Sequence, residues 1–202
     1  MATIGLDKLY YASISEDPTS GEETYAVPKP LAKAISAELS VEVAEAILYA
    51  DDGASEIVKE FKSGTLTLGV DDLGAEAAAA LTGARLDANG VLISTSEDGG
   101  APVAIGFRAA RSNGKYQYFW FYRVKFALPG TTLATKADSI TFSTPSIEGT
   151  ILRRNKPDAT GKHPWKAEVT EGAVGVKPET ITGWDTQVYE PAATTSIKPT
   201  NN

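Results

Sequence analysis

Few residues in this chain have side chains suited to catalysis, and the single histidine is the first of them. His163 stands in the run Lys162-His163-Pro164-Trp165, where the proline indicates a loop. A hydrolase built on His163, with Asp51-Asp52 as its carboxylates, would need partners that are distant in the sequence, and so would a zinc site. The other interpretation is a loop histidine beside a packing tryptophan.

Two pairs of adjacent carboxylates, Asp51-Asp52 and Asp71-Asp72, are the next candidates. Such pairs act as the two acids of a glycosidase or as calcium ligands. Glycine follows each pair closely and neither fits a calcium loop, which favours solvated turns. Segment 64–69 lacks the spacing and the lysine of a nucleotide-binding loop. The chain has no cysteine, which excludes a thiolate site. We therefore expect no enzyme activity, no metal site and no cofactor.

The three tryptophans are Trp120, Trp165 and Trp184. Tryptophan rings can form a platform on which sugars stack. A carbohydrate-binding β-sandwich that acts as a monomer is therefore an alternative function. Tryptophans more often anchor a core or an interface, which is the other interpretation of these residues.

Length and charge limit the class of protein. The 202 residues fit a single domain, placed at 1–190 with an N-terminal arm (1–36), and a flexible C-terminal tail (191–202). The formal net charge of −7 argues against general binding to phosphates, which needs a basic face. We see no signal peptide, and no apolar stretch approaches the roughly 18 residues of a membrane span, so we expect no membrane contact.

The stretch around which the chain is organised is Ala101–Phe126. Asn113-Gly114 separates two runs of β-branched and aromatic residues, and this dipeptide strongly favours a tight hairpin turn. In the second run, both alternating sets of side chains are apolar near Trp120. A strand of this kind is covered on both faces, so we expect it in the middle of a sheet.

Two further segments alternate in polarity. Residues 37–50 place apolar side chains on one face and polar or small ones on the other, which predicts a strand with one wet face. Alanine and glutamate also permit a helix over 41–48. Residues 57–70 alternate as well, and their apolar phase switches near Gly64, which indicates a bulge or a bend.

The other elements are shorter. One strand is expected around Ile4–Ile14, followed to residue 36 by a proline-marked arm or loop, with a short helical turn at Ala32–Ala37. Four consecutive alanines predict a helix over 74–82, which Gly83 ends. Further strands are expected at Val91–Thr95, Ser139–Thr144, Ile147–Arg153, Trp165–Thr170 and Thr186–Tyr189, with a loop at Lys156–Pro164. The fold class is therefore mainly β, a sandwich or barrel with one flanking helix.

Four strings carry a resemblance to a known family. They are IGLDKLYYA, SGTLTLGVDDLG with the alanine-rich helix after it, AIGFRAARSNGKYQYFWFYRVKF, and TPSIEGTILRRNKPDATGKHPWK. Together they resemble the major tail (tail-tube) proteins of long-tailed, non-contractile bacteriophages, in the lineage common in Gram-positive hosts. The likeness runs from about Ile4 to Pro191. These strings are signatures of fold and assembly and not of catalysis.

The resemblance implies a β-sandwich with a flanking helix that contributes strands to one inner β-barrel shared by a hexameric ring. Rings of this family stack into a hollow tube through an N-terminal arm and a long loop. The lumen holds the tape-measure protein and passes DNA during ejection without specific binding. Tail terminator and distal tail proteins are further partners, and the protein is assembled in the host cytoplasm into the virion. The family has no active site.

The resemblance also suggests roles for particular residues. We expect one face of segment 37–50 and its continuation after Gly64 to line the lumen, where acidic side chains repel DNA. The expected lumen-facing residues are Glu38, Ser40, Glu42, Ala44, Thr65 and Thr67. The expected contacts between rings or subunits lie in Ile4–Tyr11, Ser15–Pro30 and Lys156–Trp165, and they are Ile4, Leu6, Leu9, Tyr10, Pro28, Pro30, His163 and Trp165.

Overall fold

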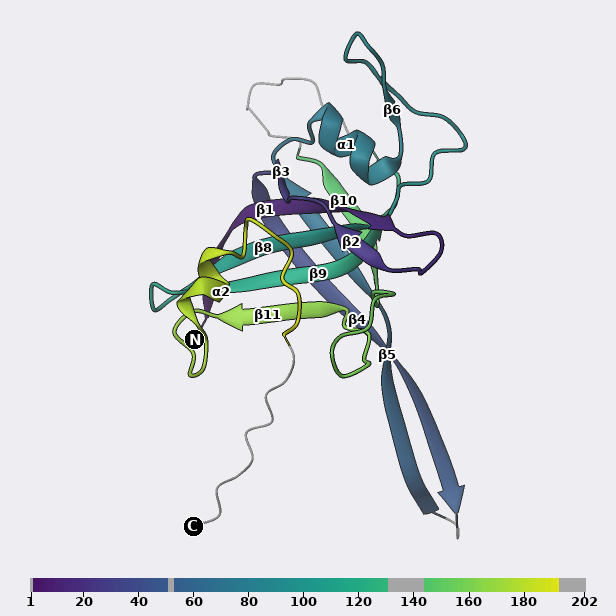
Figure 1. The fold of residues 1–202 in the computed structure, drawn as a ribbon, viewed down its shortest axis with the longest axis vertical. Coiled ribbons are helices and arrows are strands. Elements are labelled where there is room, and N and C mark those ends of the chain that lie inside the picture. Colours follow the sequence, from purple (N-terminus) through teal and green to yellow (C-terminus); the bar gives the residue numbers. More distant parts are fainter. Residues whose placement is uncertain (1, 51–52, 131–143, 193–202) are drawn as a thin grey trace, which may run out of the picture.

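The computed structural model describes residues 2–50, 53–130 and 144–192, with the side chains of 48–56 outside that description (Figure 1). The fold is mainly β, as the sequence predicts, and consists of one large antiparallel sheet with two short helices. The strands of this sheet are β1 (Thr3–Glu16), β2 (Glu23–Tyr25), β3 (Lys29–Ala32), β4 (Ala34–Ala50), β5 (Gly53–Val70), β8 (Val103–Arg111), β9 (Tyr116–Phe126), β10 (Ser146–Leu152) and β11 (Lys166–Thr170). The remaining elements are α1 (Ala75–Thr82), β6 (Arg85–Leu86), β7 (Leu92–Ile93) and α2 (Pro178–Thr182).

The order of strands in the large sheet is β2-β1-β8-β9-β10-β5-β4, with β3 paired to β1 and β11 paired to β9. The sheet curls so that β1 and β4, which are far apart in this order, contact each other. The curl encloses the main core, which contains buried side chains from β1, β5, β8, β9 and β10 together with α1. The architecture is therefore sandwich-like.

The predicted central hairpin is confirmed. Gly114 has a φ of 78°, and its N–H donates to the carbonyl oxygen of Arg111 over 3.0 Å. The second strand of the hairpin, β9, pairs with β8 along one edge and with β10 and β11 along the other. Both faces of β9 are covered, because Phe121 belongs to the main core and Trp120 to a second apolar cluster on the outer face.

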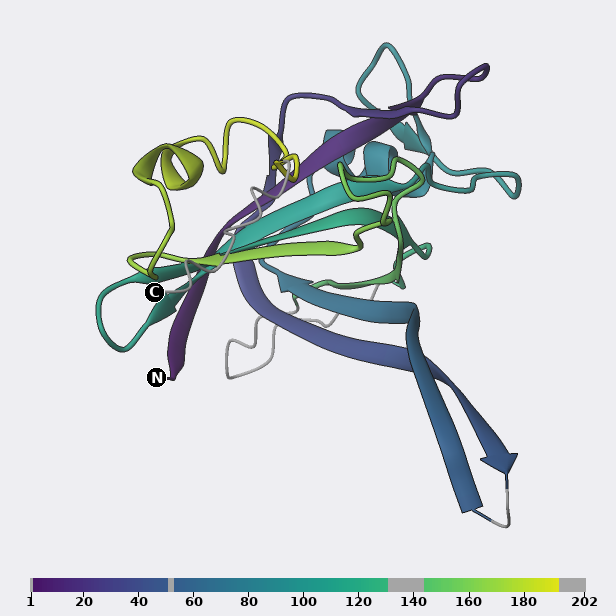
Figure 2. The same ribbon diagram turned by 60° about the horizontal axis from the view of Figure 1, so that its bottom comes forward.

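The chain after β11 covers the outer face of β8, β9 and β11 (Figure 2). Trp184 and Val188 are each 5% exposed and pack against Trp120 and Tyr122. The indole N–H of Trp120 donates to the carbonyl oxygen of Trp184 over 3.0 Å, and the Tyr122 hydroxyl donates to that of Tyr189 over 2.9 Å. These contacts anchor a segment that has no strand partner of its own.

The β4 and β5 strands form a hairpin that projects from the body at the end opposite α1 (Figures 1 and 2). The pairing of its strands shifts register at three places. At the middle one β5 has one additional residue, because Glu42 lies opposite Ser63 and Val43 lies opposite Phe61. The unpaired residue is Lys62, so the predicted phase switch is confirmed and falls two residues before Gly64. The strand interpretation of 37–50 is also confirmed against the helix over 41–48.

Several local expectations are wrong. The proline-marked segment contains β2 and β3, and Pro30 is tolerated in β3 because a short edge strand loses little by lacking one N–H. Residues 32–37 are extended and not helical, since β4 begins at Ala34. Thr186–Tyr189 is not a strand, and the helix α2 before it was not predicted. The expected strand Ser139–Thr144 lies, up to residue 143, outside the described residues.

Gly106 in β8 provides a test of the packing. A Cβ atom at this position would lie 2.7 Å from the ring of Trp120, which is fully buried and held by its hydrogen bond to Trp184. We expect Gly106→Ala to lower the free energy of unfolding by about 1–3 kcal/mol, because the ring cannot move away without strain. Urea denaturation would measure the change. Gly99→Ala is the control, since nothing lies within 4 Å of its added methyl group.

Candidate assembly surface

The six residues expected to line a lumen lie on one face of β4 and β5. Residues directly opposite each other in an antiparallel pair point to the same face. Glu38 is opposite Thr67, and Ser40 is opposite Thr65. Glu42 and Ala44 continue the β4 side of this row and, like Glu38 and Ser40, are exposed. The alternation of the sequence thus places this set correctly on one surface, which we call the polar face.

The polar face extends onto β10 and β9, which the sequence interpretation missed. Thr150 lies opposite Thr65 on one side and Lys125 on the other, while Glu148 lies opposite Thr67. Thr150, Glu148 and Lys125 are exposed. The only signal for β10 was its own alternation, in which Ile147 and Ile151 point into the core. The polar face is therefore a surface of four adjacent strands.

The polar face has a negative balance. Glu38, Glu42, Glu60 and Glu148 contribute four carboxylates, since Glu60 lies opposite Ala44. The neighbouring ammonium groups belong to Lys62 and Lys125. Lys62 Nζ lies 3.4 Å from a carboxylate oxygen of Glu42, and the Ser63 hydroxyl donates to the same oxygen over 3.3 Å. Exposed pairs of this kind contribute little to stability, so their arrangement matters mainly for the field above the sheet.

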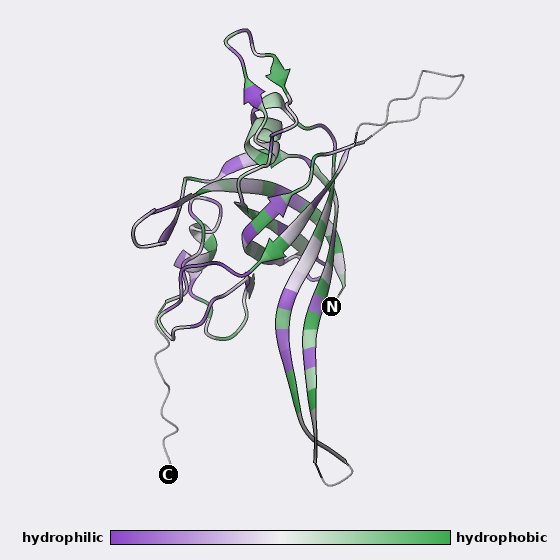
Figure 3. Ribbon diagram, turned by 90° about the vertical axis from the view of Figure 1, so that its right-hand side faces the viewer, coloured by the Kyte–Doolittle hydropathy of each residue, from purple (hydrophilic) through white to green (hydrophobic). Residues whose placement is uncertain are grey.

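The opposite face of the same hairpin is mostly apolar and bare, and the one charged pair on it in the described residues is Glu45 with Lys59, 3.1 Å apart. Figure 3 shows green and purple bands alternating along both strands of the projecting part. Val43 and Ile57 on this face are 52% and 54% exposed, and Leu39, Val41 and Ile47 are each about two-fifths exposed. Phe61 is partly covered because its ring stacks on Trp165 at a centroid distance of 4.5 Å. We call the projecting part of the β4–β5 hairpin the arm, and we call this surface the apolar face of the arm.

The outer edge of β4 is also open. Within the described part of the chain β4 pairs only with β5, although it has 17 residues. An edge of this length spans about 55 Å, and its unpaired N–H and C=O groups favour pairing with another strand. Large exposed apolar patches likewise mark contact surfaces between proteins. The hairpin thus combines an open edge with an uncovered apolar face.

A groove runs between the start of β1, the start of β4 and the β8–β9 hairpin. It has a volume of about 530 Å³. Its lining is mostly apolar and includes Leu6, Ile35, Leu39, Phe107 and Phe119. The groove marks where the two edges of the curled sheet approach each other without closing.

The expected assembly contacts are spread over different environments. Ile4 is 71% exposed and Pro30 is exposed, whereas Leu6, Tyr10 and Trp165 are half-buried. Leu9 and Pro28 are buried, so in this copy they pack inside the subunit. His163 is exposed, and its Nδ1 lies 3.1 Å from the carbonyl oxygen of Arg154. The structure does not bring these eight residues together on one surface.

The candidate chemical groups have structural roles where the structure describes them. A carboxylate oxygen of Asp71 accepts hydrogen bonds from the N–H groups of Lys33 and Asp72, over 2.9 and 2.8 Å. Asp51-Asp52 lies outside the described residues. Trp120 and Trp184 are buried and Trp165 stacks on Phe61, so their rings contact protein. Within residues 2–50, 53–130 and 144–192 no three potential ligands are arranged to hold a metal ion.

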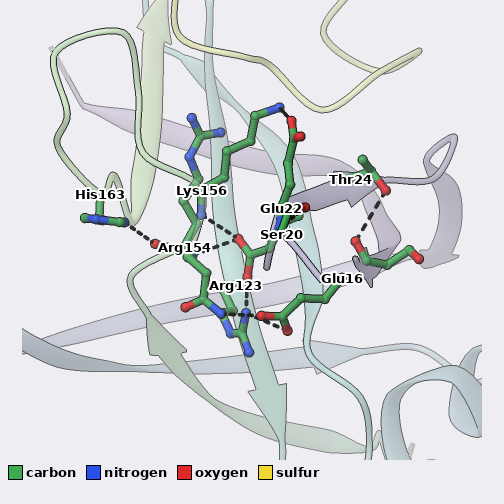
Figure 4. A network of polar contacts seen from close by, with 11 residues as sticks. Glu16, Ser20, Glu22, Thr24, Arg123, Arg154, Lys156 and His163 are labelled. Atoms are coloured by element: carbon green, nitrogen blue, oxygen red, sulfur yellow. Dashed lines mark hydrogen bonds and ion pairs between the residues drawn. The ribbon is translucent and has the colours of Figure 1, made fainter. Parts of the chain in front are cut away.

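A network of charged side chains ties distant segments together (Figure 4). Glu23 on β2 is fully buried and accepts hydrogen bonds from Arg123 on β9 and, over 2.8 Å, from the N–H of Asn155. Arg154 is 1% exposed, pairs with Glu190 at 2.8 Å, and lies over the ring of Tyr122. Burial raises the pKa of the Tyr122 hydroxyl, which keeps it protonated as a donor. We interpret the network as a structural clamp.

No protein-family model matches this chain, and no curated protein is significantly similar to it. None of the described helices has the length and apolar character needed to cross a membrane.

Glu23→Gln tests the clamp. Removing one charge leaves the guanidinium of Arg123 partly buried beside a neutral amide, and breaking a buried pair typically costs several kcal/mol. We expect the free energy of unfolding to fall by about 3 kcal/mol in urea denaturation. The matched control is Glu22→Gln, because Glu22 is exposed and pairs with Lys156 at 3.2 Å, so its loss should cost under about 1 kcal/mol. Equal effects of the two variants would contradict the clamp.

Proposed function

We propose that the protein is a structural subunit that polymerises into a tube, in the manner of the phage tail-tube proteins that its sequence resembles. The observation that carries this proposal is the β4–β5 hairpin, which has a polar face, a bare apolar face and a free edge of 17 residues. A sheet with such an edge is completed by a strand from another copy. In this proposal the copies form stacked hexameric rings with one shared inner barrel.

The geometry of the edges favours a ring or a tube over a simple dimer. The open edge of β4 from residue 41 on does not line the groove beside β1, so a contact that joins this edge to the groove is head-to-tail. Head-to-tail contacts close into rings or continue as filaments. The projecting arm would extend from one ring to the next, where its apolar face is covered. Both kinds of contact remove exposed strand edge and exposed apolar area from water.

In the proposed tube the polar face lines the lumen. Hydroxyl and carboxylate groups from β4, β5 and β10, among them Glu38, Thr65, Glu148 and Thr150, then face the channel, together with Lys125 from β9. A negative wall repels the phosphates of passing DNA, so the DNA does not adhere. The tape-measure protein would occupy the same channel before ejection, and terminator and distal tail proteins would bind the ends of the tube. The assembled subunit is thereby part of a virion and has no catalytic role.

A carbohydrate-binding module is less well supported. Such a site needs an aromatic ring open to solvent, and the three tryptophan rings pack on protein atoms instead. Electron microscopy of concentrated protein distinguishes the two functions, because only the structural subunit produces rings or tubes.

A pair of neighbouring substitutions tests the role of the arm. Val43→Glu adds a charge to the apolar face, and Ala44→Glu adds the same charge one residue later on the polar face. We expect Val43→Glu to abolish tubes in negative-stain micrographs, because the charge would be buried between subunits. Ala44→Glu should still assemble. Circular dichroism should show both variants folded, and tube formation by Val43→Glu would contradict the proposal.

The orientation of the polar face is tested by chemical access. The chain has no cysteine, so Glu38→Cys carries a unique thiol. We expect this thiol to react quickly with a small maleimide in free subunits and in tubes. A maleimide attached to streptavidin should label free subunits but only slowly label tubes, because the lumen excludes it. Equal labelling of both states by the large reagent would place Glu38 on the outside of the tube.

A further inference from the structure

Lys8 has a backbone conformation that is unusual for its residue type. Its φ is 52°, and it is the one non-glycine residue with positive φ among those that the structure describes. Residues with a Cβ atom enter this region at a cost. The pairing of β1 with β8 shifts register at the same point, between Asp7 and Tyr10. Lys8 is therefore a break between two parts of one strand.

The two parts of β1 are held very differently. After the break, Leu9, Tyr11 and Ala12 are at most 4% exposed and belong to the cores. Before it, residues 2–5 are exposed and Leu6 and Asp7 are half-buried. The register of this first part slips again between Thr3 and Gly5. The first part of β1 thus places only Leu6 against the margin of the main core, whereas the later part places several buried side chains inside the cores.

Few contacts hold the first part in place. Asp7 accepts two hydrogen bonds of 2.7 Å from Arg108, and the carbonyl oxygen of Ala2 accepts one from the N–H of Ser112. Among the described residues, 3–7 pair only with β8, since β3 begins its pairing with β1 at Leu9. Their other side borders the open groove. If this part detached, the edge of β8 at residues 108–111 would lose its partner.

We propose that residues 2–7 are exchanged between neighbouring copies, with Lys8 as the hinge. A second copy supplies the same side chains, so its Asp7 and Gly5 meet Arg108 and Ala110 as they do within one chain. Exchange of this kind needs only a change in the hinge, which leaves the left-handed conformation for an extended one. The inference rests on the self-association proposed above, and it adds a strand that belongs to one chain and is hydrogen-bonded into the sheet of its neighbour.

Cysteine pairs test the exchange directly. A Cβ atom at Gly5 would lie 3.7 Å from the Cβ of Ala110, which is within the range for a disulfide. One preparation carries Gly5→Cys alone and another carries Ala110→Cys alone. We expect the mixed proteins, assembled and then oxidised, to form a disulfide-linked dimer containing one chain of each kind on a non-reducing gel. Mass spectrometry of the linked peptides identifies it.

A matched mixture controls for general proximity. Gln117 and Thr170 are opposite each other on β9 and β11, in a part of the sheet that the proposal leaves intact. A mixture of Gln117→Cys and Thr170→Cys chains should give no linked dimer. The double variant Gly5→Cys/Ala110→Cys, oxidised as free subunits, should be locked and unable to assemble until it is reduced. Assembly of the locked chain would overturn the exchange.

The two proposals fail in different ways. Tubes without the mixed disulfide would leave the structural function in place and overturn the exchange. Absence of the mixed disulfide from every fraction overturns the exchange whether or not tubes form, whereas absence of rings and tubes rejects the structural function. A mixed disulfide found in soluble oligomers alone would support the exchange and reject the tube.

The hinge provides a second readout. Lys8→Gly and Lys8→Val both remove the ammonium group that pairs with Asp185, so a difference between them reports on the backbone. Glycine accepts the positive φ, whereas a β-branched residue favours the extended hinge. We expect the valine variant to give about five- to tenfold more mixed disulfide than the glycine variant at limiting concentration. Equal yields would show that Lys8 is not the hinge.

Discussion

The large sheet has a single outer face, and that face meets two different environments. Under the C-terminal segment it is aromatic, because Tyr118, Trp120 and Tyr122 pack there against Trp184 and Val188. On β10, β5 and β4 the same outer face carries hydroxyl and carboxylate groups. The change takes place within β9, where the register against β8 shifts between Ile105 and Val103. The rest of the structure depends on this division of the outer face into an aromatic part and a polar part. The segment with Trp184 and Val188 covers the aromatic part.

The division explains why the arm is uncovered on both sides. The core encloses the parts of β5 near Leu66 and Leu68, which are fully buried. From Gly64 toward residue 57 the hairpin leaves the body, and the unpaired Lys62 keeps Phe61 and Ile57 on the face that continues the core. An apolar stripe that continues outside the core costs free energy unless something covers it. A second copy of the chain is the simplest partner with matching surfaces, and this is the physical basis of the proposed tube.

The local elements could be predicted from the sequence because their signals are short-range. Asn113-Gly114 fixes a turn, the alanines of α1 favour a helix, and the alternation of β4 separates its two faces before any partner is known. The polar face was therefore assigned correctly on β4 and β5. Its continuation through Glu148 was not, since only strand order places β10 beside β5.

Contacts between distant segments could not be predicted. Glu23 and Arg123 are separated by 100 residues, and nothing near either residue indicates its partner. Pro28 and Pro30 predict an extended arm, but the edge of β1 accepts β3 although Pro30 lacks an N–H group. The segment after α2 has no alternating pattern, because side chains of β9 satisfy its carbonyl groups in place of a strand partner. Tertiary context decided each of these cases.

The additional residue at Lys62 has a consequence for how the arm tolerates change. Side chains on a strand alternate strictly, so one inserted residue reverses every face that follows it. Lys62 aligns Phe61 and Ile57 with Val43 and Ile47 on one side of the arm. If Lys62 instead took the place opposite Val43, the far half of β5 would turn over, and Phe61 and Ile57 would lie on the polar face. The separation of the two faces of the arm therefore depends on Lys62 staying unpaired as much as on the composition of β5.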